Sequence, residues 1–215
     1  MPRGDVVSMA PDRRRQLLRT AAREFAEAGY ERASLNRVLV ACGMSKSSFY
    51  HYLDGKEALF DLVVSEATAA MSDALAVPSA AELGDGDFWP AIARLLDQLL
   101  TLDETAWFED FGRMVHLADA PPASSLARFL AGIRAWLDQA LDVGRAGGAV
   151  RTDLPASLQT QLVLAVLLAM DRWSLTQQPS ADPATRHQLA ATQLDTLRRL
   201  LDPAVHPAAP TPSLR

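Results

Sequence analysis

Residues 34–59 read SLNRVLVACGMSKSSFYHYLDGKEAL, and this stretch decides the fold of the first part of the chain. Two short helices are predicted within it, one after Ser34 and one after Ser45, because a serine at this position accepts hydrogen bonds from the free N–H groups of a first helical turn. Gly43 lies between them, where the left-handed backbone that commonly ends a helix favours glycine. A helix, a tight turn and a short polar helix in this order are typical of a helix-turn-helix, whose second helix lies in the major groove of DNA.

The polar side chains of the predicted second helix suit contact with DNA. Lys46, Ser47 and Ser48 occupy its first turn, and in this motif the N-terminal residues of the second helix meet base edges. A lysine can donate to guanine O6 and N7, and a serine can pair with several bases. Tyr50 and His51 lie further along, where a hydroxyl and an imidazole can donate to phosphates.

The next helix is predicted to begin after Asp54, because Asp54 and Glu57 have the spacing of a capping box. Lys56 lies in its first turn, where the helix dipole and the ammonium group together favour a phosphate. The alternative is a solvated helical hairpin with incidental charges, which would not need these elements in this order. The candidate DNA-binding residues are Ser34, Ser45, Lys46, Ser47, Ser48, Tyr50, His51 and Lys56.

Residues 14–62 resemble the DNA-binding domain of the tetracycline-repressor (TetR) family. The matching elements are Phe25, Gly29-Tyr30, Ser34, Gly43-Met44-Ser45-Lys46, Phe49-Tyr50, Tyr52-Leu53 and Lys56-Glu57. The resemblance implies a homodimeric, ligand-responsive transcription regulator, usually a repressor. Leu53 stands where the family usually has phenylalanine, and Val38-Leu39 where it often has Ile-Ala, which are core changes of tolerable volume. Ser47 replaces a common glycine on the reading face and bears on the choice of operator.

Charge is distributed unevenly along the chain. The whole chain has a formal charge of −5 at pH 7 and a pI of about 5.3, which alone would argue against a nucleic-acid partner. Residues 1–56, however, hold ten Lys and Arg and six Asp and Glu, a net of +4, whereas residues 57–215 hold eleven and twenty, a net of −9. The only two lysines, Lys46 and Lys56, both lie in the motif. A basic head on an acidic body suits a protein that docks DNA with one end.

Length and composition are ordinary for a protein of one or two domains, with 215 residues of which 49% are hydrophobic. The single cysteine, Cys42, excludes an internal disulfide and is interpreted as a small core residue. Residues 1–10 lack the apolar segment of a signal peptide. The longest apolar run, residues 162–170, is far shorter than the roughly 18 residues of a membrane span. We expect a cytoplasmic protein without a membrane partner.

An all-α fold of about nine helices is expected, because apolar residues recur at helical spacing and little β-branched alternation suggests a strand. Caps, prolines and glycines predict helices at about 11–28, 35–42, 46–52, 56–75, 87–102, 104–118, 124–147, 153–176 and 182–201. We divide the chain into a disordered tail at 1–10, a helix-turn-helix domain at 11–55, a ligand-binding and dimerisation domain at 56–202 and a disordered tail at 203–215.

The last two predicted helices indicate a dimer. Residues 162–170 are apolar all round, so this helix must be covered on more than one side. Both helices could pack inside one monomer. We favour a four-helix interface built from two such pairs, as the resemblance implies, because a helix-turn-helix reads palindromes best as a two-fold dimer. The candidate interface residues are Leu162, Val166, Leu194, Leu197 and Leu201.

Large apolar side chains gather between residues 88 and 173, and all four tryptophans lie there. A helical bundle rich in such side chains can enclose an apolar cavity, although aromatic residues at helical spacing more often form a core. Asp171 follows the apolar run directly, where it either pairs with an arginine at the interface or faces a cavity and favours a cationic ligand. The candidate ligand-binding residues are Trp107, Phe108, Phe111, Met114, Met170, Asp171 and Trp173.

The sequence offers little for catalysis. His116 and Asp119 could share a helix face, but two ligands do not make a metal site, and they are better interpreted as caps of a helix end. We find no glycine-rich phosphate loop and no nucleophile motif. We therefore expect no catalytic residue, metal or cofactor.

The function predicted from the sequence is that of a ligand-responsive DNA-binding regulator. Its simplest form is a repressor that binds a palindromic operator as a homodimer and is released by a small apolar or amphipathic molecule. The alternatives are a DNA-binding regulator without a small-molecule ligand, an all-helical enzyme and a helical adaptor. Repressor and activator differ by promoter geometry, which the sequence does not contain.

Overall fold

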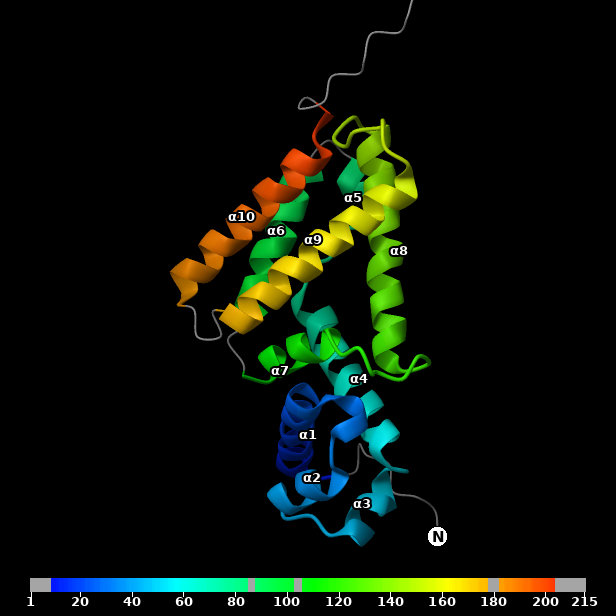
Figure 1. Cartoon of the computed structure of the whole chain (residues 1–215), viewed down its shortest axis with the longest axis vertical. Helices are drawn as coiled ribbons and strands as arrows, with labels where there is room; N and C mark the ends of the chain where they lie inside the picture. Colours follow the sequence, from blue (N-terminus) through cyan, green and yellow to red (C-terminus); the bar gives the residue numbers. More distant parts are fainter. Residues whose placement is uncertain (1–8, 85–87, 103–105, 178–181, 204–215) are drawn as a thin grey trace, which may run out of the picture. The chain divides into compact units, whose positions relative to one another are not determined.

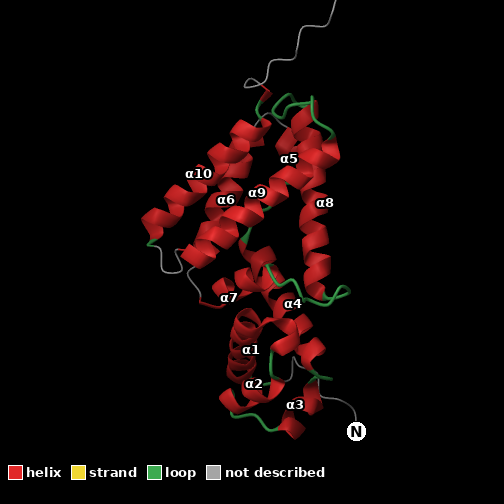
Figure 2. Ribbon diagram, in the orientation of Figure 1, coloured by secondary structure: helices red, strands yellow, loops and turns green. Residues whose placement is uncertain are grey.

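The computed structural model describes residues 9–84, 88–102, 106–177 and 182–203, without the side chains at 100–102, 106, 107 and 183. Over these residues the chain forms ten helices and no strand (Figure 1, Figure 2). The helices are α1 (Pro11–Arg32), α2 (Leu35–Ala41), α3 (Lys46–Tyr52), α4 (Lys56–Ala74), α5 (Ala80–Gly84), α6 (Phe88–Leu102), α7 (Ala106–Val115), α8 (Ser125–Ala146), α9 (Ala156–Gln177) and α10 (Pro183–Leu201). The all-α class is confirmed. The predicted tails, apart from residues 9, 10 and 203, lie outside the described residues.

The chain divides into two compact units. The N-terminal unit, Met1–Ala74 with Leu102–Ala131, contains α1 to α4, α7 and the first turns of α8. The C-terminal unit, Leu75–Thr101 with Gly132–Arg215, contains α5, most of α6, the rest of α8, α9 and α10. Within the N-terminal unit, α7 packs against α1 and α4. The predicted boundary at residue 55 separates a DNA-binding domain from a ligand-binding and dimerisation domain. This functional division stays a prediction.

Two serine caps define the helix-turn-helix. The Ser34 hydroxyl accepts from the N–H of Arg37 at 3.4 Å, and the Ser45 hydroxyl accepts from the N–H of Ser48 at 3.1 Å. Between the two helices, Gly43 has a φ of +59°, the left-handed conformation that glycine adopts without strain. The caps and the turn therefore follow the local signals in the sequence.

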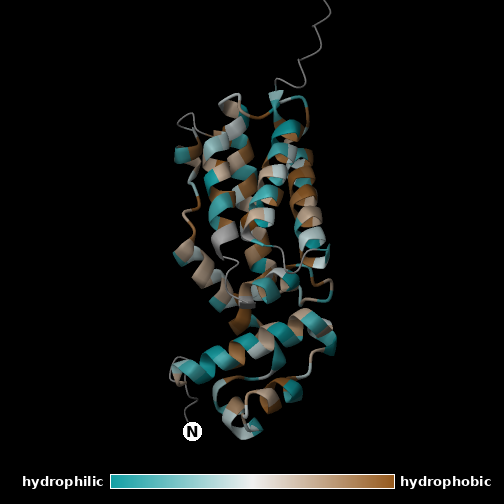
Figure 3. Cartoon of the chain, turned by 90° about the vertical axis from the view of Figure 1, so that its left-hand side faces the viewer, coloured by the Kyte–Doolittle hydropathy of each residue, from teal (hydrophilic) through white to brown (hydrophobic). Residues whose placement is uncertain are grey.

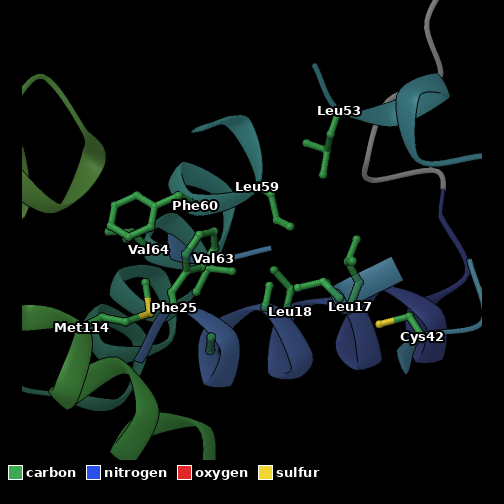
Figure 4. Packing of buried hydrophobic residues seen from close by; sticks show 14 of the residues in the cluster. Leu17, Leu18, Phe25, Cys42, Leu53, Leu59, Phe60, Val63, Val64 and Met114 are labelled. Carbon is green, nitrogen blue, oxygen red and sulfur yellow. The ribbon is translucent and has the colours of Figure 1, made fainter. Parts of the chain in front are cut away.

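The core of the N-terminal unit lies between α1, α4 and α7. Figure 4 shows Phe25 and Met114 grouped with Phe60, while Leu17 and Cys42 lie at the other end of α1. All five side chains are buried. These side chains come from α1, α4, α7 and the C-cap of α2. The core beneath the helix-turn-helix therefore depends on α7, a helix more than forty residues further along the chain.

The end of α1 differs from the prediction. The predicted helix stopped at residue 28, but one further turn follows a kink at Gly29, whose φ of 77° and ψ of 167° are not helical. This combination is nearly exclusive to glycine. A Cβ at residue 29 would also lie 2.9 Å from Oδ2 of Asp119. The kink therefore requires glycine for its backbone and for the space beside it.

Replacing Gly29 by alanine is expected to destabilise the N-terminal unit by about 1–3 kcal/mol from backbone strain, to which displacement of the Asp119 carboxylate adds. Urea unfolding measures this loss. Gly43→Ala is the matched control, because it places a Cβ on a left-handed residue with no atom within 4 Å and should cost about 1–2 kcal/mol. Equal losses in the two variants would contradict the close approach at Gly29.

The C-terminal unit is held by an apolar core and a buried amide. Gln159 is fully buried. Its Oε1 accepts from Nη1 of Arg145 at 2.7 Å, and its Nε2 donates to the carbonyl of Arg151 at 2.7 Å. These bonds offset the cost of removing the amide from water. Figure 3 shows brown and teal residues along the same helices, as expected where one face is buried and another is solvated.

One helix, α5, was missing from the prediction, so the expected count of about nine becomes ten in the described part of the chain. Its signal is a capping box that begins at Ser79: the backbone N–H of Ser79 donates to Glu82 at 2.8 Å, and the N–H of Glu82 donates to the Ser79 hydroxyl at 3.3 Å. None of the described helices has the length and apolarity to cross a membrane.

Candidate nucleic-acid interface

The helix α3 presents its polar first turn to solvent. Lys46 and Ser47 are exposed and Ser48 is half-buried. Tyr50, 52% exposed, packs its ring edge-on against Phe49 with centroids 5.3 Å apart, and the His51 side chain is exposed. The predicted base-reading groups and two of the predicted phosphate-binding groups, Tyr50 and His51, thus lie on one short helix, and all but Ser48 are exposed. Their contact with DNA stays a prediction.

The fully buried Phe49 anchors this helix to the core, and Met44 and Leu53, at its two ends, are buried as well. The Ser45 side chain is occupied by its cap on Ser48, which fixes the N-terminus of the helix. A short helix held at three apolar points and one cap keeps its exposed side chains in a constant register, as base reading requires.

The start of α2 is braced to α1 by Glu24. Its carboxylate accepts from the backbone N–H of Ser34 at 2.7 Å and from Nε of Arg37 at 3.0 Å. The hydrogen bond from Arg37, and then that from Ser34, hold the pKa of Glu24 below its ordinary value. At neutral pH the carboxylate is therefore ionised and keeps both partners.

Lys56 has partners within the protein. Its Nζ donates to the carbonyl oxygens of Tyr30 at 2.8 Å, Glu31 at 2.9 Å and Ala33 at 3.4 Å. It also lies 4.8 Å from the centroid of the Tyr30 ring. An ammonium has three N–H groups, so a phosphate would have to share or replace one of these bonds. The predicted phosphate contact stays untested, and the geometry gives Lys56 a role at the end of α1.

Asp119 also contacts the end of α1, a role that the sequence did not indicate. Asp119, between α7 and α8, accepts from the N–H groups of Tyr30 at 3.1 Å and Glu31 at 2.9 Å. These backbone bonds, that from Glu31 first, lower the pKa of Asp119. The sequence suggested that Asp119 caps its own helix end, but these bonds cap a turn of α1, 88 and 89 residues away. No short-range signal could have revealed this pairing.

The candidate ligand-binding residues of α7 belong to the N-terminal unit. Phe111 and Met114 are buried in its core, and the Phe111 ring lies 5.7 Å from that of Phe129. Phe108 is half-buried. The side chain of Trp107 lies outside the described residues. Phe111 and Met114 thus pack in the core. This agrees with the alternative interpretation that aromatic and other large side chains at helical spacing form a core.

The other candidates belong to α9 in the C-terminal unit. Met170 is half-buried and Asp171 is exposed. Trp173, 46% exposed, lines an open groove of about 500 Å³. The groove is formed by Ala165, Leu168, Ala169, Arg172, Trp173 and Thr176. The candidate ligand-binding residues are therefore divided between the units, and a shared pocket stays a prediction.

Two of the five predicted dimer residues are buried within one chain, and three are partly exposed. Leu197 and Leu201 are buried in the core of the C-terminal unit, with Leu197 only 5% exposed. Leu162, Val166 and Leu194 are half-buried. An apolar row that sequence reasoning missed lies along α9 instead: Leu158, Ala165, Leu168, Ala169 and Trp173 are all exposed. Their spacing puts them on one helix face, a signal that was present but hidden by the surrounding apolar run.

The described side chains include no group of three or more His, Cys, Asp or Glu that could hold a metal ion. Two consecutive acidic residues on α7, Glu109 and Asp110, both pair with Arg113. Burial, as the largest cause, raises the pKa of Asp110. This cluster braces α7.

Comparison with known proteins identifies the N-terminal unit. Residues 17–63 match the model of the family described as bacterial regulatory proteins, tetR family. Over 60 residues the chain is 43% identical to the HTH-type transcriptional repressor Rv1474c of Mycobacterium tuberculosis. This alignment covers 28% of this chain and 32% of that repressor, so the match spans about a third of the relative's length.

Solved structures share the fold of nearly the whole chain. A TetR family transcriptional regulator from Chloroflexus aurantiacus superposes with a TM-score of 0.70 at 20% identity, covering 91% of this chain and 96% of that one. The structure of AibR in complex with isovaleryl coenzyme A and operator DNA gives a TM-score of 0.65 at 19% identity, covering 86% and 97%.

The structure is that of an all-helical protein with a helix-turn-helix near its N-terminus and further helices after it. The resemblance drawn from the sequence is confirmed: residues 17–63 match the tetR family of bacterial regulatory proteins, and most of the chain shares its fold with a TetR family regulator.

Proposed function

We propose that this protein is a DNA-binding transcriptional regulator, acting as a repressor that binds a palindromic operator as a homodimer. The observation that carries the proposal is the Ser45-capped helix α3, which presents Lys46 and Ser47 in its exposed first turn above a buried Phe49. Support comes from the match of residues 17–63 to the tetR family model and from the HTH-type repressor that is 43% identical to this chain over 60 residues. That relative points to a regulator rather than an enzyme.

In this proposal Lys46, Ser47 and Ser48 read base edges, whereas Tyr50 and His51 contact phosphates. The division follows their order along α3, since residues at the N-terminus of a recognition helix reach deepest into the major groove. The experiment that tests the function is selection of bound duplexes from a random pool by the full chain. An enriched palindrome is the expected result, and failure to enrich any sequence would reject the proposal.

The two lysines are expected to respond differently to substitution by alanine. Lys46→Ala should cost about 1–3 kcal/mol of operator binding and relax the preference at one position in each half-site, because an exposed base contact is lost. Lys56→Ala separates two roles. If Lys56 holds a phosphate, the slope of log affinity against log salt should fall by about one unit per half-site; if its ammonium serves the end of α1, affinity falls while the slope stays unchanged.

Operator titrations at several salt concentrations measure both lysine variants. The three carbonyl partners of Lys56 favour the second outcome. Identical, sequence-independent losses in both variants would contradict the assignment of base reading to Lys46.

The dimer is proposed to form through the exposed face of α9, with α10 beside it (Figure 1). An exposed row of apolar residues on one helix is what a two-fold interface buries on both copies at once. Its large exposed side chains are Leu158, near the start of the helix, and Leu168 and Trp173 further along; Leu168 is 41% exposed. The half-buried Leu162, Val166 and Leu194 would border this row, whereas Leu197 and Leu201 support it from within.

A small apolar or amphipathic molecule is proposed to release the operator by favouring a conformer whose reading heads do not match successive major grooves. AibR, which shares this fold, was solved in complex with isovaleryl coenzyme A and operator DNA, which supports an amphipathic ligand for this chain. Screening small molecules, acyl-coenzyme A thioesters among them, for release of the selected duplex tests this part. A regulator without a ligand is the outcome if none releases DNA.

A further inference from the structure

The last turn of α1, which follows the kink at Gly29, leads through the C-cap Ala33 to the N-cap of α2. Charged side chains hold both ends of this segment, residues 30–33. Asp119 accepts from the first two N–H groups of the turn, those of Tyr30 and Glu31. Lys56 donates to carbonyl oxygens at the other end. An anion at the amino end and a cation at the carboxyl end both favour a helical turn.

We infer that Asp119, acting with Lys56, is a positioning residue for DNA reading: the two charges fix the direction in which α2, and with it α3, leaves α1. The inference rests on the proposed function, because positioning matters only if α3 reads DNA. Asp119 itself acts on α3 only through the backbone of residues 30–33.

The connection from the turn to α2 is short and stiff. Ser34 follows Ala33 directly, donates its own N–H to Glu24 on α1 at 2.7 Å, and caps α2 with its hydroxyl. A rotation of the turn is therefore passed to α2 with no flexible residue between them. Gly29 completes the arrangement, because a Cβ there would collide with the Asp119 carboxylate.

Asp119 also lies where a signal from the rest of the chain could enter. The segment that carries it leads into α8, whose first residue, Ser125, donates its N–H to Asp61 on α4 at 2.7 Å. α8 then continues into the C-terminal unit. A displacement of α8 that moved this segment would change the bonds to Tyr30 and Glu31. In a dimer the result would be a change in the spacing of the two reading helices, which must match successive major grooves about 34 Å apart.

The test uses the full chain and the palindromic duplex that the wild-type protein selects from a random pool. A series of duplexes moves the two half-sites closer or further apart by one and two base pairs. For each protein, the ratio of affinities between the best spacing and its neighbours is measured. We expect this ratio to fall about fivefold or more in Asp119→Ala, the size of a typical coupling between sites, because its reading heads are held less firmly.

Asp182→Ala is the matched control. Asp182 caps α10 with the same kind of bonds, accepting from the N–H groups of Ala184 at 3.0 Å and Thr185 at 3.1 Å. The Asp182→Ala substitution should lower the melting temperature without changing the ratio of affinities between the best half-site spacing and its neighbours. Asp119→Asn keeps one acceptor oxygen and should lie between wild type and Asp119→Ala. Amide hydrogen exchange provides a second measurement, since Asp119→Ala should speed exchange at Tyr30 and Glu31.

The outcomes are distinct. If the wild-type protein enriches no duplex, the proposed function fails and the inference falls with it. If the wild type selects a palindrome but Asp119→Ala keeps the wild-type spacing ratio, the positioning role is overturned while the function stands. A fall in the ratio for Asp182→Ala as large as that for Asp119→Ala would likewise overturn it, because loss of stability would then explain both. If Asp119→Ala does not fold, Asp119→Asn decides by the same ratio.

Discussion

Glutamate in place of Leu168 is expected to convert the proposed dimer into folded monomers and to abolish tight binding to the proposed operator. Leu168 is 41% exposed on the apolar face of α9, so the single chain covers its side chain only in part and should fold with a polar residue there. In a two-fold dimer the substitution would bury an unpaired carboxylate on each copy, which costs about 3–5 kcal/mol per charge. The dimer dissociation constant should rise roughly 100-fold or more, since 1.4 kcal/mol is a factor of ten.

Sedimentation at micromolar concentration measures the association state, and the helical circular dichroism signal reports whether the monomer is folded. Val77→Glu is the matched control, because Val77 is also an exposed apolar residue, 50% accessible, but lies outside α9. It should leave a dimer. Leu197→Glu should instead unfold the C-terminal unit, because Leu197 lies in its core. A wild-type chain that sediments as a monomer, or a Leu168→Glu chain that stays dimeric, would contradict the proposed interface.

Phe60→Ala is expected to destabilise the N-terminal unit by about 3–5 kcal/mol, because it leaves a cavity in a closely packed aromatic cluster. The Phe60 ring is fully buried and lies edge-on to Phe25 and Tyr30, with centroids 5.0 and 5.2 Å away. Since whole proteins are stable by only about 5–15 kcal/mol, operator binding should weaken through loss of the folded head. Urea unfolding gives the size of the effect, with an unchanged slope against denaturant if only stability is altered.

Two variants calibrate this result. Phe60→Leu keeps an apolar side chain of similar volume and should cost less than about 1.5 kcal/mol. Tyr50→Ala removes an exposed ring and should change stability by no more than about 0.5 kcal/mol, while weakening DNA binding. Should Phe60→Ala and Tyr50→Ala unfold at the same urea concentration, the aromatic cluster would not be the centre of the head's stability.

Local signals in the sequence were enough to predict the helix-turn-helix. Ser34 and Ser45 cap helices through residues three positions away, and Gly43 ends a helix through its own backbone. Such interactions depend on neighbours in the chain, which a reader of the sequence can see. The short helix α5 was not predicted, although Ser79 and Glu82 form a capping box that is visible in the sequence. Local information was therefore sufficient to predict this helix too.

Long-range packing accounts for what the sequence did not reveal. The leucines of α10 gave a wide apolar stripe, but only the fold determines that Leu197 and Leu201 face the chain's own core. Lys56 is a residue type that commonly contacts phosphate, yet in this structure its ammonium donates to carbonyl oxygens 23 to 26 residues earlier in the chain. Asp119 is bonded to residues almost ninety positions away. No pattern of local spacing contains these pairings.

The dependence of the turn at residues 30–33 on Asp119 also bears on the exchange of reading heads between regulators. A chimera that transfers only residues 11–56 to another body would carry Lys56 with it but leave the carboxylate behind. The amides of Tyr30 and Glu31 would then need a new acceptor from the recipient. A functional transplant must therefore include the segment between α7 and α8, or recreate an acidic side chain there. The proposed DNA-reading unit of this protein therefore consists of two separate stretches of the chain.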